Sequence, residues 1–471
     1  MEVKHTYEKW YKVVMSYERA YKRWEARVDR IIRRYKDDSR YDRNPNARFN
    51  ILWSNVQTIQ PAIFARLPRP DVSRRFRDND PIGRVASMML ERALEFELEH
   101  YGDYKSAMNN SVLDRLLGGR GTAWVRYEPH IAGEEAGEPE DGVEVTEDID
   151  EDETAEGMER EDSERIEYEC APVDYVHWKD FGHTVARTWE EVTAVWRKVY
   201  MTRPALIERF GEELGSRIPL DTKPADDKNS YKPGEGLYEA LIYEVWDKET
   251  GQVLWISKSL GKILDVKDDP LQLENFWPCP KPLYATLTTD SLEPIPDFVI
   301  YQDQARELDV LCDRIDGLIN ALKVRGVYDA SASELQRLFS EGENNTMIPV
   351  HNWMAFAEKQ GMKGAIDLVD LAPFASALMA CYQAMEQVKG QIYELMGIAD
   401  IQRGQTDPNE TLGAQIIKSN NAAGRLKTMQ HSVVDFATSL LAIKSQIICK
   451  HFTEDTILKI SGAKQLSPQD Q

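Results

Sequence analysis

The sequence has few cysteines and lacks the motifs of common hydrolases and nucleotide-driven enzymes. Its five cysteines are odd in number and show no CxxC spacing, which argues against a disulfide framework and predicts reduced thiols in the core. No GxxxxGK[ST] phosphate loop, GxSxG elbow or HExxH helix occurs in the 471 residues. We therefore expect neither an ATPase nor a hydrolase, with no catalytic residues and no cofactor.

Long apolar runs are also missing. No stretch reaches the roughly eighteen consecutive apolar residues that a membrane-spanning helix needs. The first seven residues contain no apolar signal region. These absences predict a protein that is made in a cytoplasm and has no membrane partner.

Positive charge is scarce, because 58 lysines and arginines stand against 80 carboxylates and give a net charge of −22. Residues 133–164 hold seventeen of the carboxylates and only one arginine. This segment has almost no large apolar residues, so we expect a solvated, mobile insertion between strands. The remainder is only mildly acidic, and the total charge therefore does not exclude nucleic acid as a partner.

Three groups of residues resemble metal sites, and each has a simpler interpretation. Residues 148–159 match a calcium loop except that Glu153 replaces the required glycine. Glu97 and His100 have the spacing of a di-iron half-site, but a second pair is missing and a solvated helix end explains them better. The third group lies on an expected strand and turn: Asp174, His177, Asp180 and His183. We expect no metal.

Two helical stretches of similar length, 297–323 and 373–396, are the most informative feature of the chain. Their apolar residues alternate at spacings of three and four, which places one narrow stripe along each helix. The stripes are Phe298, Tyr301, Ala305, Leu308, Cys312, Ile315, Ile319 and Leu322, and Phe374, Leu378, Cys381, Met385, Val388, Ile392 and Leu395. Each helix is roughly 36–40 Å long. Spacing alone equally allows an ordinary core hairpin.

A small insert and a polar loop accompany these helices. The insert, 324–372, predicts a short helix at 333–340 and β-like pieces at 347–350 and 366–369. After the second helix, Gly397 is placed to end it in the left-handed conformation. Signals for a new helix start follow the loop: Asp407, Pro408 and Glu410.

The N-terminal 296 residues predict an α+β body. Helices are expected first, and short strands with one further helix follow. The expected helices are 5–40, 47–65, 81–100, 103–117 and 201–210, and the clearest strands are 122–127, 192–199, 241–246 and 252–256.

The order of helix, insert, helix, polar loop and long helix resembles the core of portal proteins of tailed bacteriophages, especially the short-tailed phages. Residues 397–411 are similar to that family's segment after its second stem helix. Further family landmarks follow in family order at 55–63, 68–72, 175–182 and 201–211. The resemblance covers most of the chain. The chain differs from the family at its C-terminus, because about twenty residues after Phe452 are too few for the long helical barrel that some members carry.

The resemblance implies an α+β, mainly α, portal-like fold. It assigns residues 1–296 to a wing with the acidic insertion, 297–323 to stem helix 1, 324–372 to a clip, 373–396 to stem helix 2, 397–409 to a channel loop, 410–452 to a long wing helix and 453–471 to a short tail or minimal crown.

The function that the resemblance implies is that of a portal, a ring of about twelve subunits at one capsid vertex. Double-stranded DNA would pass through it non-specifically during packaging and ejection. The implied partners are the terminase large subunit, the head-completion, neck or tail adaptor proteins, and the major capsid and scaffolding proteins. The implied location is the virion, with host cytoplasm during assembly. The competing class is a non-catalytic helical scaffold or adaptor of a virion or prophage.

Candidate site residues follow from this resemblance. In the loop, Gln402, Arg403, Gln405 and Thr406 offer transient polar contacts to DNA with one fixed charge. At the end of the first stem helix, Lys323 and Arg325 could contact phosphates, although the helix dipole equally favours cations there. Docking of the motor and adaptors is assigned to the clip: Arg337, Glu341 and Trp353.

Overall fold

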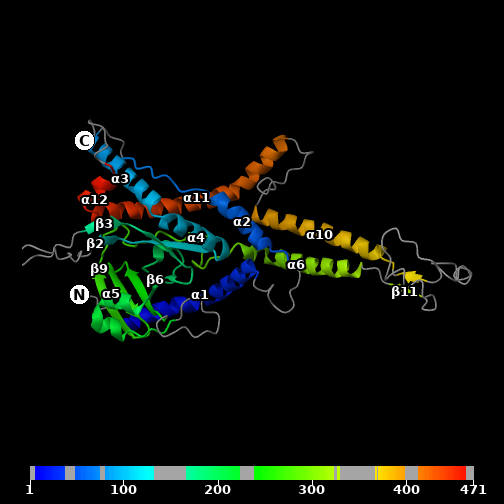
Figure 1. The fold of residues 1–471 in the computed structure, drawn as a ribbon, viewed down its shortest axis with the longest axis horizontal. Coiled ribbons are helices and arrows are strands. Elements are labelled where there is room, and N and C mark those ends of the chain that lie inside the picture. Colours follow the sequence, from blue (N-terminus) through cyan, green and yellow to red (C-terminus); the bar gives the residue numbers. More distant parts are fainter. Residues whose placement is uncertain are drawn as a thin grey trace, which may run out of the picture. The chain divides into compact units, whose positions relative to one another are not determined.

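The computed structural model describes residues 6–37, 48–74, 80–131, 166–222, 238–322, 326–328, 366–368, 370–397 and 412–462 (Figure 1). Within these residues the chain has nine α-helices and several antiparallel sheets, which confirms the predicted α+β class. The chain divides into two compact units. Unit 1 comprises Met1–Ile32, Val56–Asp297 and Gly424–Gln471, and unit 2 comprises Arg33–Asn55 and Phe298–Ala423.

Unit 1 carries most of the secondary structure, and three of its helices, α1, α2 and α11, continue into unit 2. The helices are α1 (Tyr7–Lys36), α2 (Ile51–Ile63), α3 (Pro81–His100), α4 (Asp103–Leu117), α5 (Arg203–Arg217), α11 (Leu412–His451) and α12 (Glu454–Ile460), with a 3-10 turn at Trp189–Glu191. The predicted helices are confirmed. Three lengths differ from the prediction: α1 ends at Lys36 rather than near residue 40, α2 is Ile51–Ile63 rather than 47–65, and α5 extends past Gly211, where φ of 79° kinks the helix.

The largest sheet has the order β5-β6-β7-β8-β9 and is antiparallel throughout. A three-stranded sheet, β10-β1-β4, and the pair β2-β3 complete unit 1. The strands are β1 (Arg120–Val125), β2 (Glu128–Ile131), β3 (Ile166–Cys170), β4 (Val173–Val176), β5 (Phe181–His183), β6 (Ala194–Met201), β7 (Ala240–Asp247), β8 (Gln252–Ser257), β9 (Lys262–Asp268) and β10 (Leu283–Tyr284).

The five-stranded sheet is covered by a helix on each face. Successive strand residues point to opposite faces, so Tyr243 and Val245 face α1 while Ile242 faces α5. The seam of α1, with its buried Trp10 and Trp24, packs on the first face. This part of unit 1 therefore has three layers: a helix, the sheet and a second helix. Alternate residues of β7 pack against α1 and against α5.

A buried arginine ties α1 to the start of β1. Arg120 is fully buried and donates to the hydroxyl of Tyr17 (2.7 Å) and to the carbonyls of Trp178 (2.9 Å) and Phe181 (3.1 Å). Its guanidinium also lies 4.6 Å from the ring centre of Trp24. Hydrogen bonds and cation–π contacts thus replace the water that the charge loses on burial.

Helix α11 has a segment, Gly424–His451, that is long and apolar enough to cross a membrane, with a mean hydropathy of 1.4. Packing accounts for its apolar residues, because Val433, Leu440 and Ile447 are buried in unit 1. Lys444, two turns before the end of this segment, is also fully buried and pairs with Glu97 (2.8 Å). We interpret the segment as a core helix.

Unit 2 contains the two long helices that the sequence predicted. They are α6 (Phe298–Ala321) and α10 (Ala372–Met396), which confirms both helical stretches to within two residues at each end. The short strands β11 (Gly326–Tyr328) and β12 (Ile366–Leu368) pair antiparallel between them. Strand β12 was expected, whereas β11 was not. The predicted helix at 333–340 and strand at 347–350 lie outside the described residues.

Candidate DNA-channel site

The candidate channel elements are the helices α6 and α10, which lie side by side and run in opposite directions (Figure 1). Burial along them follows the predicted stripes in the main, with Tyr301, Leu308 and Ile315 on α6 facing inward. On α10 the buried residues are Cys381, Val388, Ile392 and Met396.

The predicted stripes are wrong at three positions. Leu311 is buried while its neighbour Cys312 is half-buried, Ile319 is 48% exposed, and Met396 rather than Leu395 turns inward. An α-helix of 3.6 residues per turn drifts relative to a strict three-four repeat, so the contact line moves from one residue to the next along a long helix.

Residues 33–55 brace this helix pair within unit 2. Arg34 donates to both carboxylate oxygens of Asp309 on α6, and the Nη2–Oδ1 distance is 2.8 Å. Asn50 donates to the carbonyls of Arg34 (3.2 Å) and Tyr35 (3.1 Å) at the end of α1. On α10, Lys389 lies 4.7 Å from the ring centre of Phe49. Sequence reasoning missed this brace, since nothing local signals a pair 275 residues apart.

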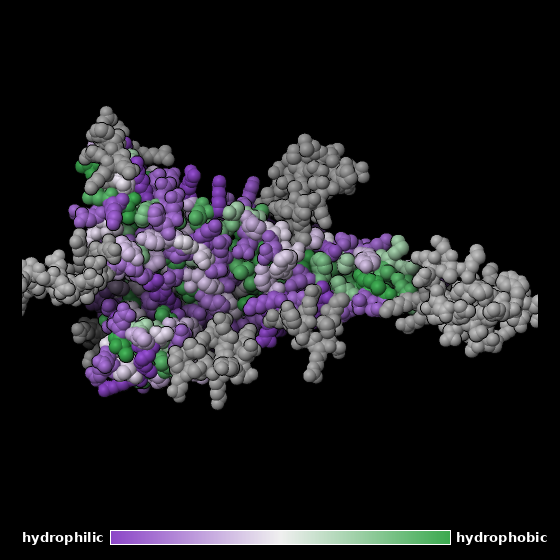
Figure 2. Space-filling model, in the orientation of Figure 1, coloured by the Kyte–Doolittle hydropathy of each residue, from purple (hydrophilic) through white to green (hydrophobic). Residues whose placement is uncertain are grey.

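The outer faces of the helix pair leave large apolar side chains exposed, and Figure 2 shows an apolar area over these helices. The exposed residues are Ile300 (48%), Val310 (51%) and Ile319 (48%) on α6, and Met379 (67%), Tyr382 (44%) and Leu395 (38%) on α10. Six large apolar side chains on one helix pair exceed the scattered single exposures of an ordinary surface, which is typical of an interface.

Negative charge dominates α6. The helix carries two arginines, Arg306 and Arg314, against five carboxylates: Asp303, Glu307, Asp309, Asp313 and Asp316. Of these, Asp309 is paired with Arg34. Asp303, Glu307 and Asp316 are exposed, as are both arginines, so the solvent-facing charges of this helix are three negative and two positive and form no concentrated positive surface for phosphate.

The end of α10 has the geometry that the sequence predicted. Gly397 has φ of 66° and ψ of 29°, and its N–H donates to the carbonyl of Glu394 (3.2 Å). A left-handed terminal residue of this kind favours glycine, because any Cβ is strained there. The segment that the sequence assigned to a channel loop therefore follows a defined helix end.

Every candidate site residue from the sequence lies outside the described residues. These are Gln402, Arg403, Gln405 and Thr406 of the loop, Lys323 and Arg325 after the first stem helix, and Arg337, Glu341 and Trp353 of the clip. What the structure defines are the flanking elements: α6 ends at Ala321, α10 at Met396, and α11 begins at Leu412. The loop assignments remain predictions.

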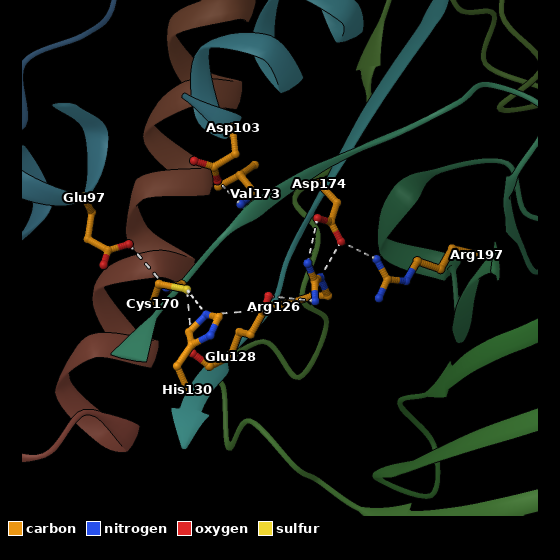
Figure 3. Close-up of polar contacts among 10 residues, drawn as sticks. Glu97, Asp103, Arg126, Glu128, His130, Cys170, Val173, Asp174 and Arg197 are labelled. Atoms are coloured by element: carbon orange, nitrogen blue, oxygen red, sulfur yellow. Dashed lines mark hydrogen bonds and ion pairs between the residues drawn. The ribbon is translucent and has the colours of Figure 1, made fainter. Parts of the chain in front are cut away.

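The predicted strand-and-turn interpretation of Asp174 and the histidines near it agrees with their contacts. Asp174 accepts from Arg126 (2.5 Å) and Arg197 (2.9 Å), as Figure 3 shows. His183 is buried next to Tyr21, and burial lowers its pKa to about 3. Burial also lowers the pKa of His177, although Asp180 opposes the shift. Among the described residues, no group of three or more His, Cys, Asp or Glu side chains could hold a metal.

The interpretation of Glu97 as part of a solvated helix end is wrong. Glu97 is fully buried and accepts from Lys444 (2.8 Å) and from the backbone N–H of Ala171 (3.3 Å). His100 instead stacks on Phe96 at 3.9 Å. The sequence could not show this, because the partner of Glu97 lies on α11, far along the chain.

The cysteines are all free, as expected, but Cys449 is exposed rather than in the core. Cys170 lies 3.8 Å from the Nε2 atom of His130 (Figure 3). Burial, together with Glu97 and Glu128 nearby, raises the pKa of the Cys170 thiol to about 11. A nucleophilic cysteine needs a lowered pKa, so this pair does not have the electrostatics of a catalytic dyad.

In comparisons with known proteins, no family model matches the chain, and no curated protein matches it.

Proposed function

We propose that this chain is a portal protein, one subunit of a ring at a capsid vertex through which double-stranded DNA enters and leaves. The observation that carries the proposal is the antiparallel pair α6 and α10, joined through β11 and β12, with six large apolar side chains exposed on its outer faces. A ring of identical subunits would cover those side chains with neighbouring copies of the same helices.

The charge on α6 supports a conduit rather than a gripping site. Phosphates held by many lysines and arginines bind tightly, with steep salt dependence, and that would arrest a moving duplex. A helix on which carboxylates outnumber arginines five to two, with two arginines among its exposed residues, offers few cations for such binding. Phosphate contacts that position DNA carry no sequence information, so passage without base recognition needs only weak polar contacts.

The proposed contacts follow the order of the elements along the chain. The loop after Gly397, with Arg403 as its one basic residue, joins α10 to α11 and is proposed to line the channel. The segment between β11 and β12 is proposed to dock the terminase large subunit and, later, the neck or tail adaptors. Capsid and scaffolding proteins are the remaining proposed partners, and the virion is the proposed location.

The mass of the purified protein tests the ring directly. We expect particles of about twelve times the 54.1 kDa chain, annular in averaged electron micrographs. Met379→Glu, at a side chain that is 67% exposed, should shift most of the protein to monomer, because a charge would enter the subunit contact. Leu214→Glu, at an apolar side chain of α5 in unit 1 that is 37% exposed, is the matched control for placing a charge at an exposed apolar position.

Two outcomes of that experiment would contradict the proposal. A stable monomer or dimer under all salt conditions favours the scaffold or adaptor class instead. A ring that forms equally well with Met379→Glu would mean that the exposed face of α10 does not hold the subunits together.

The loop provides a second prediction. Arg403→Glu should leave the ring intact and reduce DNA packaging or retention by at least tenfold, because a carboxylate repels the phosphates that Arg403 would contact transiently. Packaged DNA per particle is the measurement, and Arg403→Gln, which removes charge without reversing it, is the control and should lose less. If Arg403→Glu prevents ring formation, the loop is structural and its channel role is wrong.

A further inference from the structure

A basic stripe covers the exposed face of α1, which is not one of the candidate channel elements. Eight lysines and arginines of this helix are exposed, and six of them lie in unit 1: Lys9, Lys12, Arg19, Lys22, Arg23 and Arg30. At 100° per residue they fall on one side of the helix, and at 1.5 Å rise per residue the stripe is about 32 Å long. Among the four carboxylates of α1, Glu8 in the first turn is the exposed one.

The other carboxylates of α1 turn away from the stripe. Glu18 accepts a hydrogen bond from the hydroxyl of Tyr243 (3.2 Å) on the sheet, and Asp29 pairs with Lys179 (2.7 Å). Glu25 is half-buried between them. In the part of the chain that the structure describes, no ion pair involves Arg19, Lys22 or Arg23. The stripe is therefore a concentrated positive surface on a chain whose net charge is −22.

The side chains of α1 argue against two classes of partner, a lipid bilayer and single-stranded nucleic acid. The apolar face of α1, including Trp10 (2% exposed) and Trp24 (0%), is buried against the sheet, so α1 cannot insert into a lipid bilayer. Single-stranded nucleic acid needs exposed aromatic rings for base stacking. The large aromatic exposed on α1 is Tyr11, which lies at the start of the helix beside the stripe.

We propose that the exposed face of α1 binds the phosphate backbone of double-stranded DNA without reading its sequence. Charge complementarity carries the proposal, because arginines and lysines that lie on one face of a rigid helix can contact several of the repeated phosphates of a duplex. Arginine in particular donates two parallel hydrogen bonds to a phosphate. The inference goes beyond the proposed function, since it requires neither a ring nor a place for α1 in the channel.

A binding measurement tests it on the full-length protein. Fluorescence anisotropy with a labelled duplex of about 30 base pairs, roughly three helical turns, gives the affinity at several salt concentrations. The combined substitution Arg19→Gln, Lys22→Gln and Arg23→Gln should weaken binding at least tenfold. It should also lower the slope of log affinity against log salt by about 3. Glutamine keeps the helix propensity, so folding is expected to be unchanged.

The matched control removes the same charge elsewhere in unit 1. Arg217→Gln, Lys262→Gln and Lys267→Gln change three exposed cations of α5 and β9, and binding should stay within about twofold of the unsubstituted protein. Equal loss in both triple variants would overturn the inference, because net charge alone would then explain it. Unchanged DNA binding in the α1 variant would overturn it too, including when the particle mass changes, which would identify α1 as a protein contact.

The outcomes are independent of those for the ring. A monomeric protein whose DNA binding depends on α1 would contradict the portal proposal and support this inference. A ring that binds DNA equally well without the three cations would support the portal proposal and contradict this inference.

Discussion

Replacing Lys444 by methionine should lower the free energy of unfolding of unit 1 by about 3–5 kcal/mol, because it leaves the Glu97 carboxylate buried without its partner. Glu97 and Lys444 have side-chain exposures of 1% and 0%, and no solvent can replace the lost ammonium group. Lys444 also donates to the carbonyl of Ala171 (2.7 Å), which would lose that hydrogen bond as well.

Chemical denaturation followed by circular dichroism measures the effect. Lys427→Met is the control, since Lys427 is exposed on the same helix and should change stability by less than about 0.5 kcal/mol. The double variant Glu97→Gln with Lys444→Met removes both charges, and it should recover much of the loss. If Lys444→Met is as stable as the unsubstituted protein, the pair contributes nothing to α3 and α11 packing.

Replacing Arg120 by methionine is the second large effect, with an expected loss of about 3 kcal/mol. The substitution fills similar space but removes three hydrogen bonds, and it leaves the carbonyl of Trp178 without the donor that Arg120 supplies. The contact with the face of Trp24 is lost too. Since these groups lie on α1 and in the segment after β4, we expect the attachment of α1 to weaken first.

Amide hydrogen exchange along α1 distinguishes this cause from general destabilisation. Arg120→Met should increase exchange in α1 more than in α5 on the other face of the sheet. Arg120→Lys keeps the charge but lacks the planar fork of donors, so it should lose part of the stability. Arg217→Met, at an exposed arginine of α5, should be close to neutral. Uniform exchange increases across unit 1 would contradict the assigned role.

The proposed functions depend on these packing contacts in different ways. The stripe on α1 is presented outward only because the opposite face of the helix is held on the sheet, through Trp24, Tyr17 and Arg120. In unit 2, the Arg34–Asp309 pair holds α6 from the side. Both surfaces that we propose to meet partners, the apolar faces of α6 and α10 and the basic face of α1, are therefore the unburied sides of helices fixed elsewhere.

Local patterns in the sequence predicted the helices well. The periodic apolar residues of α1, α6 and α10 define amphipathic helices without reference to the rest of the chain. A glycine at position 397, directly after the apolar stripe, predicted the left-handed conformation found there, because few other residues tolerate a positive φ. Such features depend on the nearest turn of backbone, and the information for them lies within a few residues.

Features that depend on distant partners were missed or misjudged. Strand β11 has three residues, and its pairing with β12 makes it recognisable as a strand. Glu97 looked solvated, because a glutamate on a helix is usually exposed, and only α11 supplies the lysine that makes burial favourable. The sequence indicated no role for Met379 and Val310, and their exposure depends on which sides of α6 and α10 face each other.

By itself, then, the sequence determined the α+β class, the paired long helices, the helix end at Gly397 and the concentration of negative charge in residues 133–164. The tertiary structure decided which charges are paired and which helix faces stay uncovered. The physical reason is range: helix periodicity and capping arise from neighbouring residues, whereas burial and ion pairing arise from residues that meet only when the chain is folded.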